Sequence, residues 1–358
     1  MGDRKLIQYV DELTDKEKSM IKKVLENYNF SVIDISKVRS SYKIDTNIGA
    51  VCLKRVKHNK TKTLNSNYLA EELNKNNFPY TSKFFRTKDN YLFAAHKKMY
   101  FYVVEWIDGD ECDLNDIEEA CDCVRLLARF HLSSQCIDTK VLKIKNNLKN
   151  WPRIFKKNLG DLDKIKKHIE KKRLRSEFDK VYKSYLDSFY NMGSMCLQVL
   201  NTSDYYALSK KANEHKFVCH DSFYYQNIIK KDDTYYIVNL DNILIDLHIN
   251  DLSKFIRRLM FKKEYQWDFE KAKIMIEAYN SINKLSRSEL EAMLSMIIFP
   301  HKFCRLGKKR YIKHKDWSES KYIRKLNKLL RYNEAQQKFL NDYLCYLESF
   351  DDFKENID

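Results

Sequence analysis

The chain has 358 residues and a formal net charge of +16. Its hydrophobic residues make up 44% of the sequence, a fraction that is enough to bury a sizeable core and that excludes wholesale disorder. Its six glycines never cluster, so glycine-rich phosphate loops of the Walker and dinucleotide-binding types are excluded. No segment approaches the roughly 18 apolar residues of a membrane span. Acidic residues near the start stand where a signal peptide needs an apolar run. We therefore expect cytoplasmic synthesis without a signal peptide, and no membrane partner.

The first third of the sequence alternates between helical and strand patterns. Thr14 and Glu17 form a capping-box pattern ahead of a helix that reaches about Tyr28. Gly49 stands where a turn between two strands needs it. A second helix is expected over residues 64–75. Strands are expected over residues 30–38, 41–46, 49–56, 82–87, 90–96 and 99–107. This order predicts a small mixed sheet with one crossing helix.

From residue 113 onward the pattern is mainly helical. Residues 138–215 are Lys-rich and helical, and their charges of mixed sign are typical of a solvated face, with a docking surface as the alternative. The segment 217–246 interrupts the helices with a polar loop and two strands, at residues 227–230 and 235–240. Helices return over residues 251–260, 269–279, 286–298, 317–330 and 333–347. Loops on a packed scaffold often carry function, so segment 217–246 is the expected place for chemistry.

Polar residues in and after this loop favour phosphotransfer. In that chemistry an aspartate orients the hydroxyl proton, an asparagine and a second aspartate hold Mg²⁺, and a strand lysine holds ATP phosphates. The sequence offers Lys54 on a strand and a possible hinge that includes Glu105 and Ile107. The loop and the region after its hairpin offer further candidates, namely His220, Asp221, Asn227, Asn239 and Asp241.

The chain resembles the CotS family of bacterial spore coat proteins, which look like aminoglycoside phosphotransferases and choline kinases. The resemblance spans essentially the whole chain, and residues 237–258 and 299–311 are specific to the spore-coat branch. The resemblance also rests on three further segments, residues 49–54, 103–109 and 219–229 (CHDSFYYQNII). It implies an α+β, two-lobed protein-kinase-like fold with a β-sheet lobe at 1–108 and a mainly helical lobe at 109–358. It also implies a spore-coat location, with other coat proteins as partners.

The first departure from the family pattern lies in the loop. The pattern is His-x-Asp, then four residues, then Asn, and counting back from Asn227 puts Ser222 in the aspartate position and His220 in the histidine position. Asp221 comes one residue early. In an extended loop one step moves a side chain by about 3.3 Å and turns it to the other side. Ser222 cannot serve as a base unaided.

Two further departures affect the metal site and the lysine. The metal-binding aspartate aligns with Asn239, and Asp241, two residues on, is expected on the same strand face about 6.6 Å away. The alternative is that the strand end curls and Asp241 takes over as the metal ligand. The glutamate that should pair with Lys54 is replaced by Asn65 or Ser66. Glu71 and Glu72, nearer the helix end, are the alternative partners.

Three hypotheses follow. The first is a kinase-fold spore coat component with weak or no phosphotransfer, because three catalytic positions are altered. The second is an active kinase that uses ATP and Mg²⁺ to phosphorylate a hydroxyl of an aminoglycoside-, choline- or sugar-like substrate. The third is a basic interaction protein that uses residues 138–215; nucleic acid is the weaker partner there, because no reading motif is present. Asp251 is expected to cap the helix after the loop, a structural role near the site.

Overall fold

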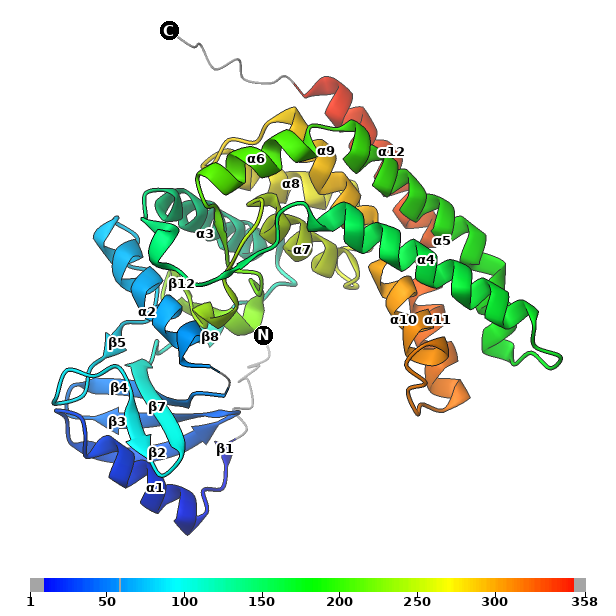
Figure 1. Cartoon of the computed structure of the whole chain (residues 1–358). Helices are drawn as coiled ribbons and strands as arrows, with labels where there is room; N and C mark the ends of the chain where they lie inside the picture. Colours follow the sequence, from blue (N-terminus) through cyan, green and yellow to red (C-terminus); the bar gives the residue numbers. More distant parts are fainter. Residues whose placement is uncertain (1–9, 58, 351–358) are drawn as a thin grey trace, which may run out of the picture. The chain divides into compact units, whose positions relative to one another are not determined.

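The computed structural model describes residues 10–57 and 59–350 (Figure 1). Its contacts divide the chain into two compact units. Unit 1 holds residues 1–113, 129–145 and 220–244, and unit 2 holds residues 114–128, 146–219 and 245–358. Segment 217–246 therefore falls largely in unit 1, while the lobe boundary at residue 108 stays a prediction.

Unit 1 is built on a seven-stranded sheet with the order β1-β2-β3-β4-β7-β5, in which β6 also pairs with β7. Neighbouring strands pair antiparallel. Helix α1 packs its buried residues Ile21 and Val24 into one apolar core with Ile44, Leu53 and Phe101 of the sheet. The strands are β1 (Val10–Asp11), β2 (Val32–Val38), β3 (Ser41–Thr46), β4 (Gly49–Arg55), β5 (Phe84–Phe85), β6 (Ala94–His96) and β7 (Met99–Glu105), and the helices are α1 (Asp15–Leu25) and α2 (Lys60–Lys75).

Local signals account for the ends of these elements. The capping box at α1 is present, since Thr14 accepts from the backbone of Glu17 and the Glu17 side chain accepts from Thr14. Gly49 adopts φ 107° at the turn from β3 to β4, a conformation that a side chain would strain. Helix α2 begins at Lys60, four residues before the expected start, because Asn59 caps it by accepting from the backbone of Thr61.

A second sheet in unit 1 has the order β12-β11-β8 and contains the expected hairpin. Its strands are β8 (Asp110–Glu111), β11 (Ile228–Lys231) and β12 (Thr234–Ile237). The second hairpin strand ends at Ile237, three residues before the expected end. Asn239 then adopts a left-handed φ of 64°, and the 3₁₀ turn η3 (Leu240–Asn242) follows. The chain therefore curls where an extended strand was expected.

Gly109 lies where β8 approaches β11 closely. A Cβ at this position would overlap the backbone carbonyl oxygen of Lys230, which is fixed in the sheet. We expect Gly109→Ala to lower the free energy of unfolding by about 2–3 kcal/mol in urea titrations, because overpacking against backbone cannot relax cheaply. The matched control is Gly160→Ala in a helix with open space around its Cα, where alanine should stabilise by about 0.5–1 kcal/mol. An equal response at both positions would contradict the close-approach argument.

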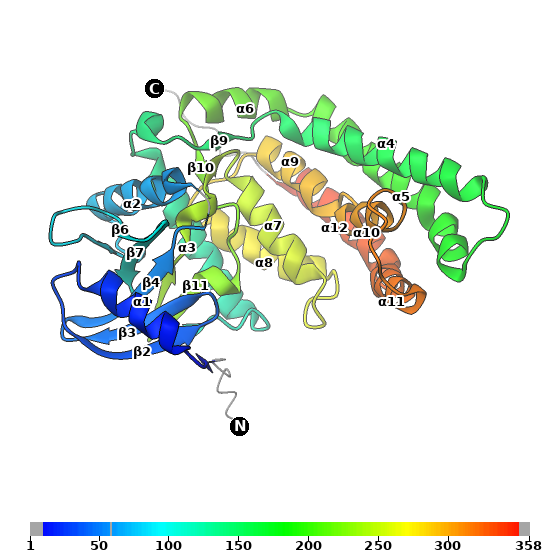
Figure 2. The same ribbon diagram turned by 60° about the horizontal axis from the view of Figure 1, so that its bottom comes forward.

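Unit 2 is mainly helical. The antiparallel helices α4 and α5 lie side by side, and α5 also packs on α9 (Figure 2). Helix α3 (Ile117–Gln135) has residues in both units. The helices of unit 2 are α4 (Asn150–Glu170), α5 (Glu177–Thr202), α6 (Tyr205–Glu214), α7 (Ile249–Met260), α8 (Phe269–Asn280), α9 (Arg287–Ile298), α10 (His301–Tyr311), α11 (Glu319–Leu330) and α12 (Asn333–Ser349). Short elements complete the chain, namely η1 (Thr139–Val141), β9 (Lys145–Asn146), β10 (Val218–Cys219), η2 (Tyr225–Asn227) and β13 (Leu244–Ile245).

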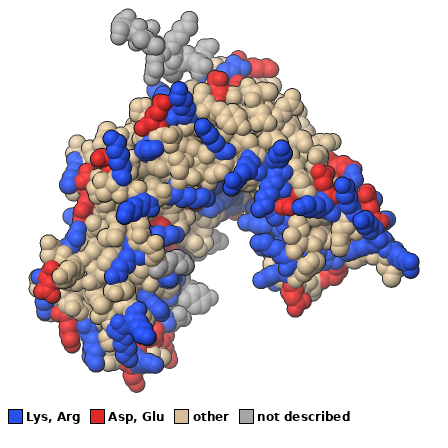
Figure 3. Space-filling model, in the orientation of Figure 1, with Lys and Arg blue, Asp and Glu red and all other residues tan. Residues whose placement is uncertain are grey.

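The Lys-rich helices carry paired charges. Lys166 of α4 bonds Asp187 of α5 at 2.7 Å, and Lys183 of α5 lies 3.3 Å from Glu170. Basic and acidic side chains are mixed over the region of α4 and α5 on the face that Figure 3 shows, whereas α10 carries no acidic residue. This mixture has the character of a solvated helix pair rather than of a uniformly basic surface. Within residues 10–57 and 59–350, no helix combines the length and apolar character that a membrane crossing requires.

Asp246, directly after β13, is a buried acid of unit 2. Its carboxylate accepts from Asn147 at 2.7 Å, from the Trp151 indole at 3.1 Å and from the Leu247 backbone at 2.9 Å. Burial raises its pKa to about 6, and these hydrogen bonds only partly oppose the effect.

The raised pKa of Asp246 predicts a pH-dependent contribution to stability. The folded state binds this proton more tightly than the unfolded state, so the free energy of unfolding should rise as the pH falls from about 6 towards 4. The contribution should be on the order of 2–3 kcal/mol. Urea titrations at several pH values should show a flatter profile for Asp246→Asn than for the natural chain. Parallel profiles would contradict the assignment.

Candidate functional site

Three polar side chains and one backbone carbonyl of unit 1 form a continuous hydrogen-bonded series. The Lys54 ammonium on β4 donates to Oδ1 of Asn239 at 2.5 Å. Asn239 in turn donates from Nδ2 to Oδ1 of Asn227 at 2.8 Å, and Asn227 donates to the backbone carbonyl of Ser222 at 2.8 Å. The structure thus brings together the expected phosphate-binding lysine and both expected amide ligands. Lys54 meets a neutral amide oxygen and not a carboxylate.

Asp241 lies on the 3₁₀ turn η3 and faces helix α2. Its Oδ1 accepts from the hydroxyl of Ser66 at 3.1 Å. Burial, together with the nearby Asp241 carboxylate, raises the pKa of Tyr102 well above its ordinary value. Because the chain turns at Asn239, the extended spacing of 6.6 Å expected between Asn239 and Asp241 does not apply. The curl instead directs the carboxylate towards α2.

The loop before the hairpin is braced through a buried histidine. Nε2 of His220 lies 3.3 Å from the carbonyl of Val238, and Nδ1 accepts from the backbone N–H of Ser222 at 3.2 Å. These contacts correspond to a neutral ring with its proton on Nε2. Asp221 is held at φ 61°, a left-handed backbone conformation, between His220 and Ser222. The Ser222 hydroxyl accepts from Asn242 at 3.1 Å.

Helix α2 supplies no carboxylate to Lys54 among the contacts of the described residues. Asn65 bonds the backbone of Lys143 in both directions, at 3.0 and 3.2 Å. The alternative partners are engaged elsewhere, since Glu71 pairs with Arg86 at 3.0 Å and Glu72 pairs with Lys75 at 2.6 Å. Ser66, the other residue expected in the glutamate position, contacts Asp241 instead.

A cavity that is partly open to solvent adjoins these residues. Phe84 and Tyr102 stack on each other along it, with ring centroids 5.9 Å apart. The expected hinge residues Glu105 and Ile107 are not among its described lining residues; Glu105 instead accepts from the backbone of Lys83 at 3.3 Å. The lining consists of Lys54, Ser66, Thr81, Ser82, Phe84, Tyr102, Val104, Ile237, Val238, Asn239, Leu240 and Asp241.

The donor set of this site fits a divalent cation poorly. Mg²⁺ prefers carboxylate and other oxygen ligands in octahedral geometry. Of the three expected ligands, only Asp241 carries charge. The side-chain oxygens of Asn227 and Asn239 already accept from Asn239 and Lys54, respectively. A metal ion at the oxygen of Asn239 would also be repelled by the Lys54 ammonium that this oxygen already accepts from.

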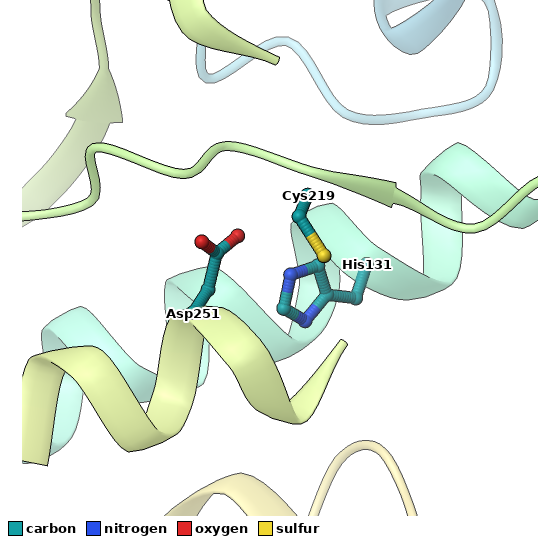
Figure 4. Close-up of side chains that lie close together, drawn as sticks. All are labelled: His131, Cys219 and Asp251. Atoms are coloured by element: carbon teal, nitrogen blue, oxygen red, sulfur yellow. The ribbon is translucent and has the colours of Figure 1, made fainter. Parts of the chain in front are cut away.

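Asp251 does not cap its helix as expected. Helix α7 begins at Ile249, and Asp251 is its third residue, with 1% of its surface exposed. Figure 4 shows its carboxylate near the thiol of Cys219, and their ligand-type atoms lie within 4.8 Å of each other. Asp251 thus lies inside the helix and beside the strand that precedes the loop. The apolar periodicity of α7 begins two residues before the aspartate, which is the signal that could have corrected the expected start.

Two residues of the site were not foreseen from the sequence. Asn242 bonds both Ser222 and Lys62, the latter at 3.1 Å, and so ties the loop and α2 to the turn η3. Tyr102 lines the cavity beside Asp241. For Tyr102, the alternation along its strand was an available signal, because one face of β7 points towards the second apolar cluster formed with Cys52 and Val104.

Comparison with known proteins bears on the whole chain. Residues 21–343 match the model of the family described as "Spore coat putative kinase YutH". The chain belongs to this family. Spore coat protein S of Bacillus subtilis (strain 168) is 22% identical over 336 residues, which cover 91% of this chain and 94% of that protein. The family expected from the sequence is therefore confirmed.

Solved structures of phosphotransferases share the fold of this family member. An aminoglycoside phosphotransferase from Alicyclobacillus acidocaldarius aligns with a TM-score of 0.82 at 17% identity, over 92% of this chain and 96% of that one. An amicoumacin kinase in complex with AMP-PNP, Ca²⁺ and Ami aligns with a TM-score of 0.55 at 12% identity, over 91% of this chain and 93% of that one. The α+β kinase-like fold expected from the sequence, a β-sheet region followed by a mainly helical one, is confirmed.

Proposed function

We propose that this protein is a kinase-fold component of the spore coat that serves a structural or binding role, with weak or no phosphotransfer. The observation that carries the proposal is the series Lys54–Asn239–Asn227–Ser222. Lys54 is the side chain that would hold ATP phosphates, and it is satisfied by an amide of its own chain. Both amide oxygens that would face a metal are likewise engaged. Family membership supports a location in the coat, with other coat proteins as partners.

An isothermal titration with ATP and Mg²⁺, paired with an assay of γ-phosphoryl release, tests this proposal. We expect weak ATP binding, little gain in affinity from Mg²⁺, and no turnover above the uncatalysed background. Robust ATP turnover that Asp221→Ala abolishes would overturn the proposal. Because Asp221 has a left-handed backbone, an Asp221→Asn variant should be measured beside it to separate lost chemistry from lost folding.

A second candidate is an active small-molecule kinase, and one observation favours it. Asp241 lines the same cavity as Lys54, so one carboxylate and one ammonium face a space where a nucleotide could bind. This candidate requires ATP and Mg²⁺ and a hydroxyl substrate of the aminoglycoside, choline or sugar type. It predicts that a screen of such alcohols will reveal substrate-dependent ADP formation. The basic-interaction hypothesis is less well supported, because Lys166 of α4 and Lys183 of α5 pair with acids of the same two helices.

A further inference from the structure

Unit 2 contains a second cavity that the kinase-like site does not use. It is partly open to solvent and lies among α5, α7, α9, α10, α11 and α12. Three of its side chains are basic, and no acidic residue is among the described residues that line it. The lining consists of Phe189, Arg257, Phe261, Trp267, Ile297, Phe299, Pro300, His301, Lys302, Phe303, Leu329 and Gln336.

Arg257 of α7 brings a guanidinium into this apolar surrounding. Its Nη1 donates to the backbone carbonyl of Met296 at 2.7 Å. Burial, and then the positive charges of Arg258 and Arg305, lower its pKa to about 9. A guanidinium has five N–H donors, so a single carbonyl leaves most of its hydrogen-bonding capacity for another acceptor.

Two further basic residues begin helix α10. Lys302 places its ammonium over the ring of Phe261, 3.2 Å from the centroid, and burial lowers its pKa to about 7. Nε2 of His301 is buried without a hydrogen-bond partner. The N-cap residue Pro300 provides no side-chain hydrogen bond to the first turn of α10. The positive end of the helix dipole thus coincides with two basic side chains.

Trp267 gives independent evidence that the cavity lacks a hydrogen-bond acceptor. Its ring is 3% exposed, yet its indole N–H has no hydrogen-bond partner. A buried donor without an acceptor destabilises the fold, and native proteins rarely retain one without a reason. Trp267 and His301 both line the cavity, together with the guanidinium of Arg257. The Trp267 indole and the Arg257 guanidinium would both be satisfied by one acceptor-rich molecule between them.

We propose that this cavity binds a small molecule that carries an oxyanion group, a carboxylate or a phosphate, on an apolar body. The oxyanion supplies the countercharge for Arg257 and Lys302 and accepts from the Trp267 indole. The rings of Phe261 and Phe299 form apolar walls for the body of the ligand. Arginine suits both anions, because its planar fork donates two parallel hydrogen bonds to either. The inference is independent of the proposed function, since it concerns other residues in another unit.

Titration of the full-length protein with benzoate, inorganic phosphate and phenyl phosphate tests the inference, with chloride at matched ionic strength as the reference. Thermal unfolding and tryptophan fluorescence are the two readouts. We expect saturable stabilisation by at least one probe, and binding weakened about tenfold or more in Arg257→Met and in Lys302→Met. Lys164→Met, which removes one exposed charge of α4, should bind like the natural chain. Preference for benzoate assigns the carboxylate, and preference for either phosphate probe assigns the phosphate.

Two results would overturn the inference. One is the absence of saturable binding by all three probes. The other is binding that Arg257→Met and Lys302→Met leave unchanged, because the anion would then lie elsewhere. If Arg257→Met does not fold, Lys302→Met decides the outcome alone, since Lys302 makes a ring contact and no hydrogen bond to the backbone through its ammonium. A change in Trp267 fluorescence that is lost in Trp267→Phe would place the probe in this cavity; a change that persists would count against it.

Discussion

The Asn239→Asp variant should bind ATP with Mg²⁺ about tenfold more tightly than the natural chain, a gain of about 1.4 kcal/mol. In the natural chain Asn239 offers Lys54 an uncharged oxygen and donates its amide to Asn227. A carboxylate at this position would pair with the lysine as a charge and would give a divalent cation a second acidic ligand beside Asp241. Titration calorimetry with and without Mg²⁺ measures the change. The gain should be confined to the metal complex of the nucleotide.

Asn242→Asp is the matched control for this variant. The substitution adds the same charge beside the same turn. The side chain of Asn242, however, contacts Lys62 and Ser222 and is not among the described residues that line the cavity. It should leave the affinity for ATP with Mg²⁺ nearly unchanged. An equal gain in both variants would show that general electrostatics, and not a ligand position at Asn239, controls binding. No gain in either variant would mean that the turn η3 cannot present a metal ligand.

Asp179→Asn should lower the free energy of unfolding by about 3 kcal/mol. Asp179 of α5 is 1% exposed, and it accepts from Tyr311 at 2.5 Å and from Lys172 at 2.9 Å. It also closes a capping box with Ser176 at the start of α5. Asparagine would leave the lysine without its countercharge and turn one acceptor into a donor. Urea titration at pH 7 measures the loss.

The pH dependence of this effect has a definite sign. Burial opposes ionisation of Asp179, but hydrogen bonds from Tyr311 and Lys172 outweigh it and lower the pKa of the carboxyl below its ordinary value. The stabilisation is therefore complete above pH about 4 and disappears as the pH falls through the lowered pKa. The difference between the natural chain and Asp179→Asn should shrink over that range. A difference that stays constant in acid would mean that the charge of Asp179 is not what stabilises α5.

Asp187→Asn provides the comparison for Asp179→Asn. Asp187 lies on the same helix and bonds Lys166 at a similar distance of 2.7 Å, but its side chain is 68% exposed. Exposed pairs contribute about 0.2–1 kcal/mol, so this loss should be several times smaller. Tyr311→Phe removes the hydroxyl that donates to Asp179, and its loss in free energy of unfolding should lie between those of the two aspartate variants. Equal losses at both aspartates would argue against burial as the source of the effect.

The sequence was most informative where a local signal determines an element. The box of Thr14 and Glu17 predicted the start of α1, and the helix expected from residue 286 is present as α9, which a box of Ser286 and Glu289 caps. Period-two alternation located most strands of the large sheet. The family resemblance then placed Lys54, Asn227 and Asn239 in one site without any distance to support it. Those three side chains are joined by hydrogen bonds in the structure.

Features that depend on distant parts of the chain were not predicted. The left-handed backbone at Asn239 has no unambiguous signal, and it redirects Asp241 towards Ser66 of a helix 175 residues away in sequence. Helix α10 was not expected, because its basic residues mask the short apolar period. The cavity around Arg257 depends on six helices at once, and no periodicity within one helix reports it.

The discontinuous composition of unit 1 bears on how the chain is made. The large sheet of unit 1 is complete by residue 105. The last segment of the unit, residues 220–244, nevertheless follows residue 145 only after a helical stretch of unit 2, residues 146–219. During synthesis the ribosome must therefore translate all of that stretch before Lys54 can meet Asn239. A fragment that stops at residue 113 would contain the sheet without the hairpin beside β8. The N-terminal sheet is consequently a poor choice for separate expression, and nascent chains should acquire protease resistance in unit 1 only after residue 244 has emerged.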